Sequence, residues 1–187
     1  LRIETGVYKD LEPTDLIASF SSQSQRAALR KFLKKEYKIG TFHNRDDYRG
    51  FYEILKDNLT KHKTIPTHSL AEILDLKDRL GESQMLALVK YKGEILAGSW
   101  VIKANRRAWH TFYIATNYKI NYEPASTSAV LHYVMRKAKD EGVKFLNFGI
   151  CTEDSGKVIN IGLATFKESL GGKLINRYTF YPKTKQQ

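Results

Sequence analysis

Apolar side chains recur at helical spacing in several stretches of the first half of the chain. Over residues 48–59 they fall three or four positions apart, which draws one continuous stripe along a predicted helix. A second helix is predicted over residues 69–80, where Ser69 and Glu72 have the spacing of a capping box. Residues 14–36 also predict a helix, although the serines in its middle favour a break.

The middle of the chain changes to the apolar pattern of strands. Residues 84–91, 94–104 and 108–116 predict three consecutive antiparallel strands, with Lys92 and Gly93 forming the tight turn between the first two. The other predicted elements are short strands over 2–9 and 41–43, a helix over 124–141, a strand over 143–148, a loop over 149–160, a helix over 163–170 and a last strand over 173–181.

This order of elements indicates an α/β fold. From residue 41 it runs strand, two helices, three strands, helix, strand, helix and strand, which is similar to the order in GNAT acyltransferases. We therefore expect a mixed central sheet with helices on both faces, preceded by a basic lead-in helix. Because a crossover through a helix returns a parallel strand, residues 108–116 and 143–148 should lie side by side and parallel.

Three stretches resemble the FemABX-like transferases, a branch of the GNAT superfamily. Residues 19–31 (SFSSQSQRAALRK) are similar to the "SFS…R…RK" segment that leads into the second half of these proteins. Residues 142–149 (GVKFLNFG) resemble the family's "G…YDFGG" strand, with Asn147 where an acid is usual. Residues 162–172 (GLATFKESLGG) resemble its "G…FK…FGG" helix. The three stretches follow the family's order, and the resemblance covers roughly residues 15–181.

The resemblance implies an N-acyltransferase or aminoacyltransferase that forms an amide on an amine of a cell-envelope or exopolysaccharide precursor. The acceptor would be a small-molecule or lipid-linked amine. Members typically carry two GNAT-like domains, and this chain matches the second. We therefore expect a fragment that lacks an N-terminal GNAT-like domain, with residues 1–40 as a lead-in strand and helix left from that domain and residues 41–187 as the acyltransferase domain.

The acyl donor stays open between an aminoacyl-tRNA and an acyl-CoA. Acetyl-CoA-dependent GNAT enzymes carry a Q/R-x-x-G-x-G/A loop, whose backbone N–H groups hold the pyrophosphate at a helix N-terminus. Residues 117–124 stand at this position and contain no glycine, so we expect weak acetyl-CoA binding. Two other functions also stay open: a non-catalytic module that binds tRNA or an anionic nucleotide-linked ligand, and an acetyl-CoA-dependent N-acetyltransferase with an atypical loop.

Three side chains are candidates for catalysis. By the resemblance, Lys167 of the family's Phe-Lys pair lies where donor and acceptor meet, and its ammonium stabilises an oxyanion or a donor phosphate. Since one helix step is about 100°, Lys167 should point away from the apolar stripe of its helix and behave as a surface residue towards stability. Tyr113 and Tyr118, in the fourth strand and the loop after it, are candidates to protonate a leaving group. A solvated lysine and packed tyrosines are the alternatives.

Four further side chains are candidates for substrate binding. Asn117 begins the loop after the fourth strand, and Asn147 lies in the apolar strand of the family motif. Glu153 and Lys157 follow in the next loop, where a carboxylate is suited to an acceptor amine; a plain polar loop is the alternative. The five histidines lack metal-binding spacing, so no metal is expected.

The formal net charge of +11 is concentrated in the second half of the chain. Residues 1–40, 41–100 and 101–187 carry +3, 0 and +8. This charge suits tRNA, a nucleotide-linked lipid or sugar, or peripheral contact with a membrane surface, and a merely solvated basic face is the alternative. A single cysteine excludes an internal disulfide framework and favours a reducing, cytoplasmic location.

Overall fold

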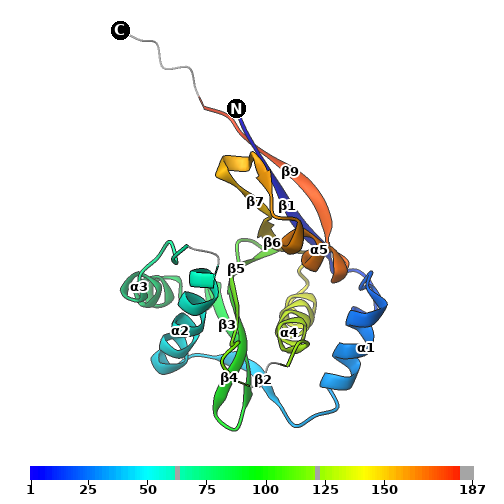
Figure 1. Cartoon of the computed structure of the whole chain (residues 1–187), viewed down its shortest axis with the longest axis vertical. Helices are drawn as coiled ribbons and strands as arrows, with labels where there is room; N and C mark the ends of the chain where they lie inside the picture. The colour runs from blue at the N-terminus through cyan, green and yellow to red at the C-terminus, as the bar shows by residue number, and fades with distance from the viewer. Residues whose placement is uncertain (62–63, 121–122, 182–187) are drawn as a thin grey trace.

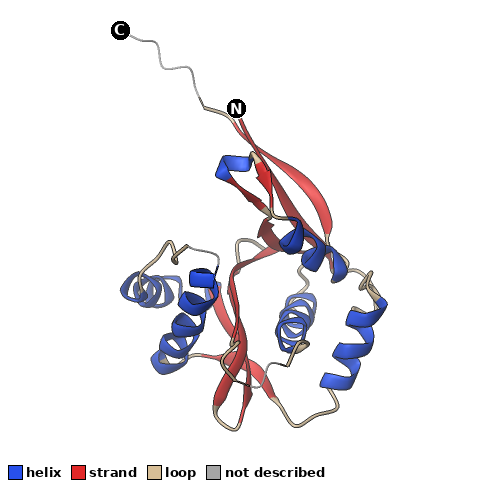
Figure 2. Cartoon of the chain, viewed as in Figure 1, coloured by secondary structure: helices blue, strands red, loops and turns tan. Residues whose placement is uncertain are grey.

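The computed structural model describes residues 1–61, 64–120 and 123–181 of the 187-residue chain. Seven strands form one mixed sheet in the order β2-β3-β4-β5-β6-β1-β9, and β7 and β8 form a separate small hairpin (Figures 1 and 2). The elements are β1 (Arg2–Asp10), α1 (Gln23–Phe32), β2 (Lys38–Phe42), α2 (Arg45–Lys61), α3 (Leu70–Leu80), η1 (Gly81–Ser83), β3 (Gln84–Tyr91), β4 (Glu94–Ile102), β5 (Ala108–Thr116), α4 (Ser126–Asp140), β6 (Phe145–Ile150), β7 (Thr152–Glu153), η2 (Asp154–Gly156), β8 (Val158–Ile159), α5 (Ile161–Ser169) and β9 (Lys173–Thr179).

Helices cover both faces of the sheet and enclose two apolar clusters. Helices α1, α4 and α5 lie on one face, where Leu29, Leu131 and Leu170 are fully buried. Helices α2 and α3 lie on the other face, where Phe51 and Ile73 pack against the strands (Figure 1). This arrangement confirms the predicted α/β fold with a mixed central sheet and helices on both faces.

The central strands β5 and β6 lie side by side and parallel, as the sequence predicts. They pair at three positions, of which the last joins His110 to Asn147. Beyond that pair, β5 continues to Thr116 alongside β4, and β6 continues to Ile150 alongside β1. Among the described residues the two strands do not pair again, so the centre of the sheet opens at this point. We call this opening the splay.

A β-bulge on each strand accounts for the splay. In β5, Thr111 and Tyr113 pair with consecutive residues of β4, which leaves Phe112 as an extra residue. In β6, Phe148 and Gly149 both lie opposite a single residue of β1, and Gly149 has a φ of 77°. Bulges bend the strand that contains them and increase its twist. The two bulges follow directly after the last paired position and turn the strands apart.

The first 22 residues differ in part from the prediction. The helix predicted over residues 14–36 is wrong for its first part, because α1 begins only at Gln23. Asp15 accepts hydrogen bonds from the backbone of Ile17 and Ala18, and the Ser22 side chain caps α1 by accepting from Gln25. Such local bonds replace those that a continuous helix would make. The predicted loop over residues 149–160 contains the β7–β8 hairpin and η2.

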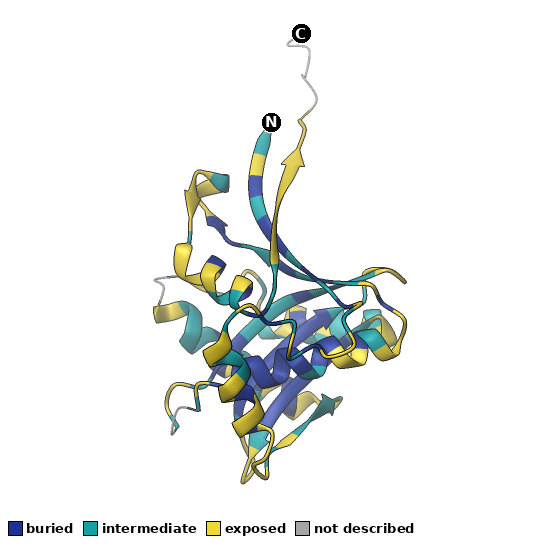
Figure 3. Cartoon of the chain, turned by 90° about the vertical axis from the view of Figure 1, so that its right-hand side faces the viewer, coloured by how far each residue is buried: buried dark blue, intermediate teal, exposed yellow. Residues whose placement is uncertain are grey.

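The N-terminal strand lies inside the sheet. β1 pairs with β6 on one side and with β9 on the other, and both pairings are antiparallel. Together β1 and β9 extend beyond the helices, and β9 is exposed along its whole length (Figure 3). The assignment of residues 1–40 to an upstream domain stays a prediction.

Gly98 in β4 tests the contact between the sheet and α2. A Cβ atom at this position would lie 2.6 Å from Cδ2 of Phe51 and 2.7 Å from Cδ2 of Leu88, and both side chains are fully buried. We expect Gly98→Ala to lower the free energy of unfolding by about 1–3 kcal/mol in urea denaturation, because the added methyl group overpacks the core. In Gly40→Ala, the matched control, the nearest atom to the new Cβ is 3.9 Å away. This variant should stay within about 0.5 kcal/mol of the parent. Equal stability of the two variants would contradict the packing described.

Candidate functional site

Side chains take over the hydrogen bonding of the sheet at the splay. The backbone oxygen of Asn147 lies 3.2 Å from Nδ1 of His110 and 3.2 Å from Oγ1 of Thr111, which donate to it. Because a carbonyl oxygen only accepts, this bond places the ring hydrogen of neutral His110 on Nδ1. The other ring nitrogen, Nε2, then carries a free electron pair.

Lys167 reaches the same opening from α5. Its Nζ donates to the backbone oxygen of Ile150, at the end of β6, over 2.7 Å. The residue is only 4% exposed, so the expectation that Lys167 behaves as a surface residue is wrong. The reason lies in how α5 packs, since Ala164 and Lys167, one helical turn apart, both face inward.

Burial shifts the protonation of both groups. It lowers the pKa of Lys167 to about 8, against a small opposing effect of Cys151, so the ammonium is mainly protonated at neutral pH. Burial also lowers the pKa of His110, opposed by its bond to Asn147 and reinforced by the positive charges of Arg177 and Lys167. The splay therefore holds a buried cation and a neutral imidazole close enough to affect each other electrostatically.

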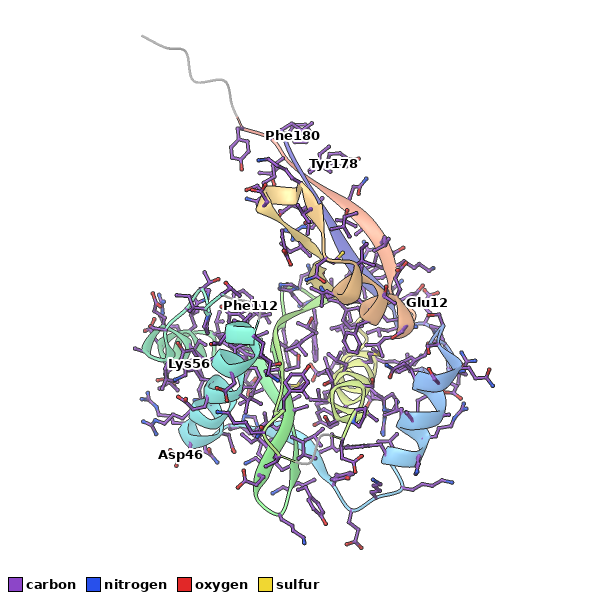
Figure 4. All side chains as sticks on the ribbon, in the orientation of Figure 1. Glu12, Asp46, Lys56, Phe112, Tyr178 and Phe180 are labelled. Carbon is purple, nitrogen blue, oxygen red and sulfur yellow. The ribbon has the colours of Figure 1, made fainter. Side chains whose placement is uncertain are left out.

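The two candidate tyrosines lie elsewhere. Tyr113 follows the β5 bulge, and its hydroxyl forms a 3.0 Å hydrogen bond with Nδ1 of His68. Its ring is stacked on Trp100, within the apolar cluster under α2 and α3, where Figure 4 labels the neighbouring Phe112. Tyr118 is exposed, and Nζ of Lys61 lies 3.6 Å from its ring centroid. The catalytic roles of both tyrosines stay predictions.

The four predicted binding residues are not gathered at one place. Asn147 lies at the splay, where its side chain accepts from the backbone N–H of Gly149 over 2.8 Å. Asn117 bonds to the backbone of Ile95, beyond the far end of β5, about 23 Å of strand from His110. Glu153 and Lys157 belong to the β7–β8 extension: Glu153 accepts from Asn160, and Lys157 lies 3.4 Å from Asp154.

Sequence reasoning missed His110 and Thr111 as parts of the site. A histidine inside an apolar strand gives no signal by spacing, and its role at Asn147 depends on where β5 and β6 stop pairing.

Within residues 1–61, 64–120 and 123–181, no group of three or more histidine, cysteine or acidic side chains is arranged to hold a metal ion. No helix in this part of the chain has the length and apolar character to span a membrane.

This chain matches known proteins in structure but not in sequence. No protein-family model and no curated protein matches the sequence. The crystal structure of FemX superimposes with a TM-score of 0.77 over 93% of this chain, at 15% identity. The chain has the fold of FemX. This result confirms the GNAT-like, FemABX-type fold that the three sequence stretches predict.

Two further structures share the FemX fold. One is the C-terminal domain of a protein described as a lysylphosphatidylglycerol synthetase from Agrobacterium fabrum, with a TM-score of 0.67, 16% identity and 95% of this chain covered. The other is L-PGS from Bacillus licheniformis, with a TM-score of 0.62, 16% identity and 94% covered. The chain spans 60% of FemX, 60% of the Agrobacterium protein and 61% of L-PGS.

Burial of Lys167 makes stability depend on pH. The folded-state pKa of about 8 lies below the ordinary lysine value of 10.5, so between these two pH values the unfolded chain binds more protons. We expect the parent protein to gain stability over the Lys167→Met variant as the pH rises. The difference between their free energies of unfolding should increase by roughly 3 kcal/mol from pH 7 to 11. Urea denaturation of both proteins across this range measures it.

Lys157→Met is the control, because the Lys157 side chain is 75% exposed. Its stability difference from the parent should stay flat over the same pH range. If Lys167→Met also gave a flat difference, the ammonium of Lys167 would be solvated in the folded protein.

Proposed function

We propose that the chain is the acyltransferase domain of a FemAB-like N-acyltransferase or aminoacyltransferase, which forms an amide on an amine of a cell-envelope or exopolysaccharide precursor. The observation that carries this proposal is the buried ammonium of Lys167 at the splay. Two proteins share the fold: one is described as a lysylphosphatidylglycerol synthetase and the other as L-PGS. Lysylphosphatidylglycerol is an aminoacylated lipid. The fold likeness to FemX supports the same chemical class.

Acyl transfer needs a group that stabilises negative charge on the carbonyl oxygen. When an amine attacks an ester carbonyl, the C–N bond forms and the oxygen becomes an oxyanion. A fixed cation in a water-poor site stabilises that charge far more than one in solvent. Among the described residues, Lys167 donates one hydrogen bond, to Ile150, and so keeps two N–H groups for a ligand. No side-chain nucleophile is required for this reaction.

The start of α4 supports an aminoacyl-tRNA donor over acetyl-CoA. In acetyl-CoA-dependent GNAT enzymes this helix N-terminus holds the pyrophosphate. Here the first helical residues, Ser126, Thr127 and Ser128, are buried, and Ser128 donates to Gln25 of α1 over 2.8 Å. Just before them, the Glu123 carboxylate accepts from Lys35 over 2.6 Å. A carboxylate that already occupies this corner opposes a pyrophosphate.

The proposal extends to the partners of the whole protein. A charged tRNA supplies the activated ester in the cytoplasm, and the net charge of +11 favours its polyanionic backbone. The acceptor is a small-molecule or lipid-linked amine, with peripheral contact to a membrane surface in the second case. An upstream GNAT-like domain completes the acceptor site, in keeping with the 60% of FemX that the chain spans.

Loss of the Lys167 charge tests the proposal directly. In the full-length protein, we expect Lys167→Met to lower kcat by roughly 100- to 1,000-fold, as removal of an oxyanion donor does. The assay follows transfer of radiolabelled amino acids from bulk aminoacylated tRNA to cell-envelope precursors. Lys144→Met, at an exposed position just before β6, should keep the parent rate. Binding of tRNA without transfer in the parent protein would instead favour the non-catalytic module.

Acetyl-CoA binding provides a second, independent test. We expect calorimetric titration of the chain with acetyl-CoA to show no binding in the micromolar range, because residues 117–124 offer no glycine-lined anion site and the first turn of α4 is covered. A micromolar Kd would overturn the choice of donor and identify an acetyl-CoA-dependent enzyme with an atypical loop.

A further inference from the structure

We propose that His110 is the proton carrier of the transfer reaction: its Nε2 takes the proton from the attacking amine and returns it to the leaving oxygen. The inference rests on the proposed function and adds a second catalytic residue to Lys167. It starts from the hydrogen bond between Nδ1 of His110 and the backbone oxygen of Asn147, which is 3.2 Å long. That bond uses the ring N–H, so Nε2 of the neutral ring is left as an acceptor.

The backbone around His110 holds the ring and leaves room beside it. His110 is the last β5 residue paired with β6, so the splay begins at its position. The ring of Phe112 lies edge-to-face against the imidazole at 6.0 Å between centroids. A Cβ on Gly149 would lie 3.4 Å from Cε1, the carbon between the two ring nitrogens. Glycine at the β6 bulge, with its φ of 77°, therefore places no side chain against this edge of the ring.

The charged groups around His110 favour a neutral base. Arg177 faces it from β9 and Lys167 from α5, and both carry positive charge. Its pairing partners Ile102 on β4 and Asn147 on β6 are uncharged. Two nearby cations and partial burial disfavour the imidazolium, so the ring is unprotonated at neutral pH and returns a proton readily once it has taken one.

The proposed reaction balances without a further reactant. The amine nitrogen attacks the carbonyl carbon of an aminoacyl ester, and the C–N bond forms while its proton passes to Nε2 of His110. The π electron pair of the carbonyl moves to the oxygen beside the Lys167 ammonium. When this pair returns, the ester C–O bond breaks, and the leaving ribose oxygen takes the proton from Nε2. The products are an amide and a free hydroxyl, with His110 neutral again.

The His110→Asn variant distinguishes a catalytic role of His110 from a purely structural one. In His110→Asn the amide N–H stands where Nδ1–H stood, so the bond to Asn147 is retained while Nε2 is lost. The test measures kcat and KM of the full-length protein from pH 5 to 8, with bulk aminoacylated tRNA as donor and Nα-acetyl-lysine amide as acceptor. His43→Asn, at an exposed position, is the matched control and should match the parent.

We expect His110→Asn to lower kcat by about 100-fold or more, with little change in KM for the donor. In the parent, kcat should fall below an apparent pKa under 6.5 as His110 takes a proton, and the variant should lack this fall. If His110→Asn does not fold, His110→Ala with added imidazole replaces it, and partial recovery of the rate supports the proposal. Parent-like kcat, or an unchanged pH profile without rescue, would overturn it. A parent protein that transfers nothing would instead refute the proposed function.

Discussion

The separation of β5 and β6 after three paired residues is the constraint on which the rest of the site depends. Two bulges turn the central strands apart, so carbonyl groups in the middle of the protein lose their partners in the sheet. Buried carbonyls that stay unbonded cost free energy, so other donors must replace those partners. His110 and Thr111 donate hydrogen bonds to the backbone oxygen of Asn147, and Lys167 donates one to the backbone oxygen of Ile150. The polar groups that carry the proposed chemistry thus also repair the interrupted sheet.

This double role explains why a lysine sits inside an apolar cluster. Its ammonium is desolvated, which costs stability at neutral pH. The hydrogen bond to the backbone oxygen of Ile150 offsets part of that cost. A methionine would pack there without this penalty, so the charge is expensive to keep for structural reasons alone. Such a cost is typical of residues retained for function.

Local patterning predicted most elements, and packing decided what it could not. The three strands over 84–116 were predictable because alternating and continuous apolar runs reflect burial directly, and the parallel central pair follows from the handedness of crossovers. The environments of Lys167 and His110 were not predictable. They depend on which face of α5 meets the sheet and on a bulge at Phe112, and neither feature leaves a pattern in neighbouring residues.

The position of β1 between β6 and β9 has a consequence for how the chain assembles. β1 has partners that lie about 140 and 170 residues later in the sequence, and β9 pairs with no other described strand. Contacts so distant in sequence are slow to form, because a long loop must close before they are made. The sheet is therefore completed only after β9 has left the ribosome. Until β6 has emerged, β1 is an unpaired strand that can pair with other chains.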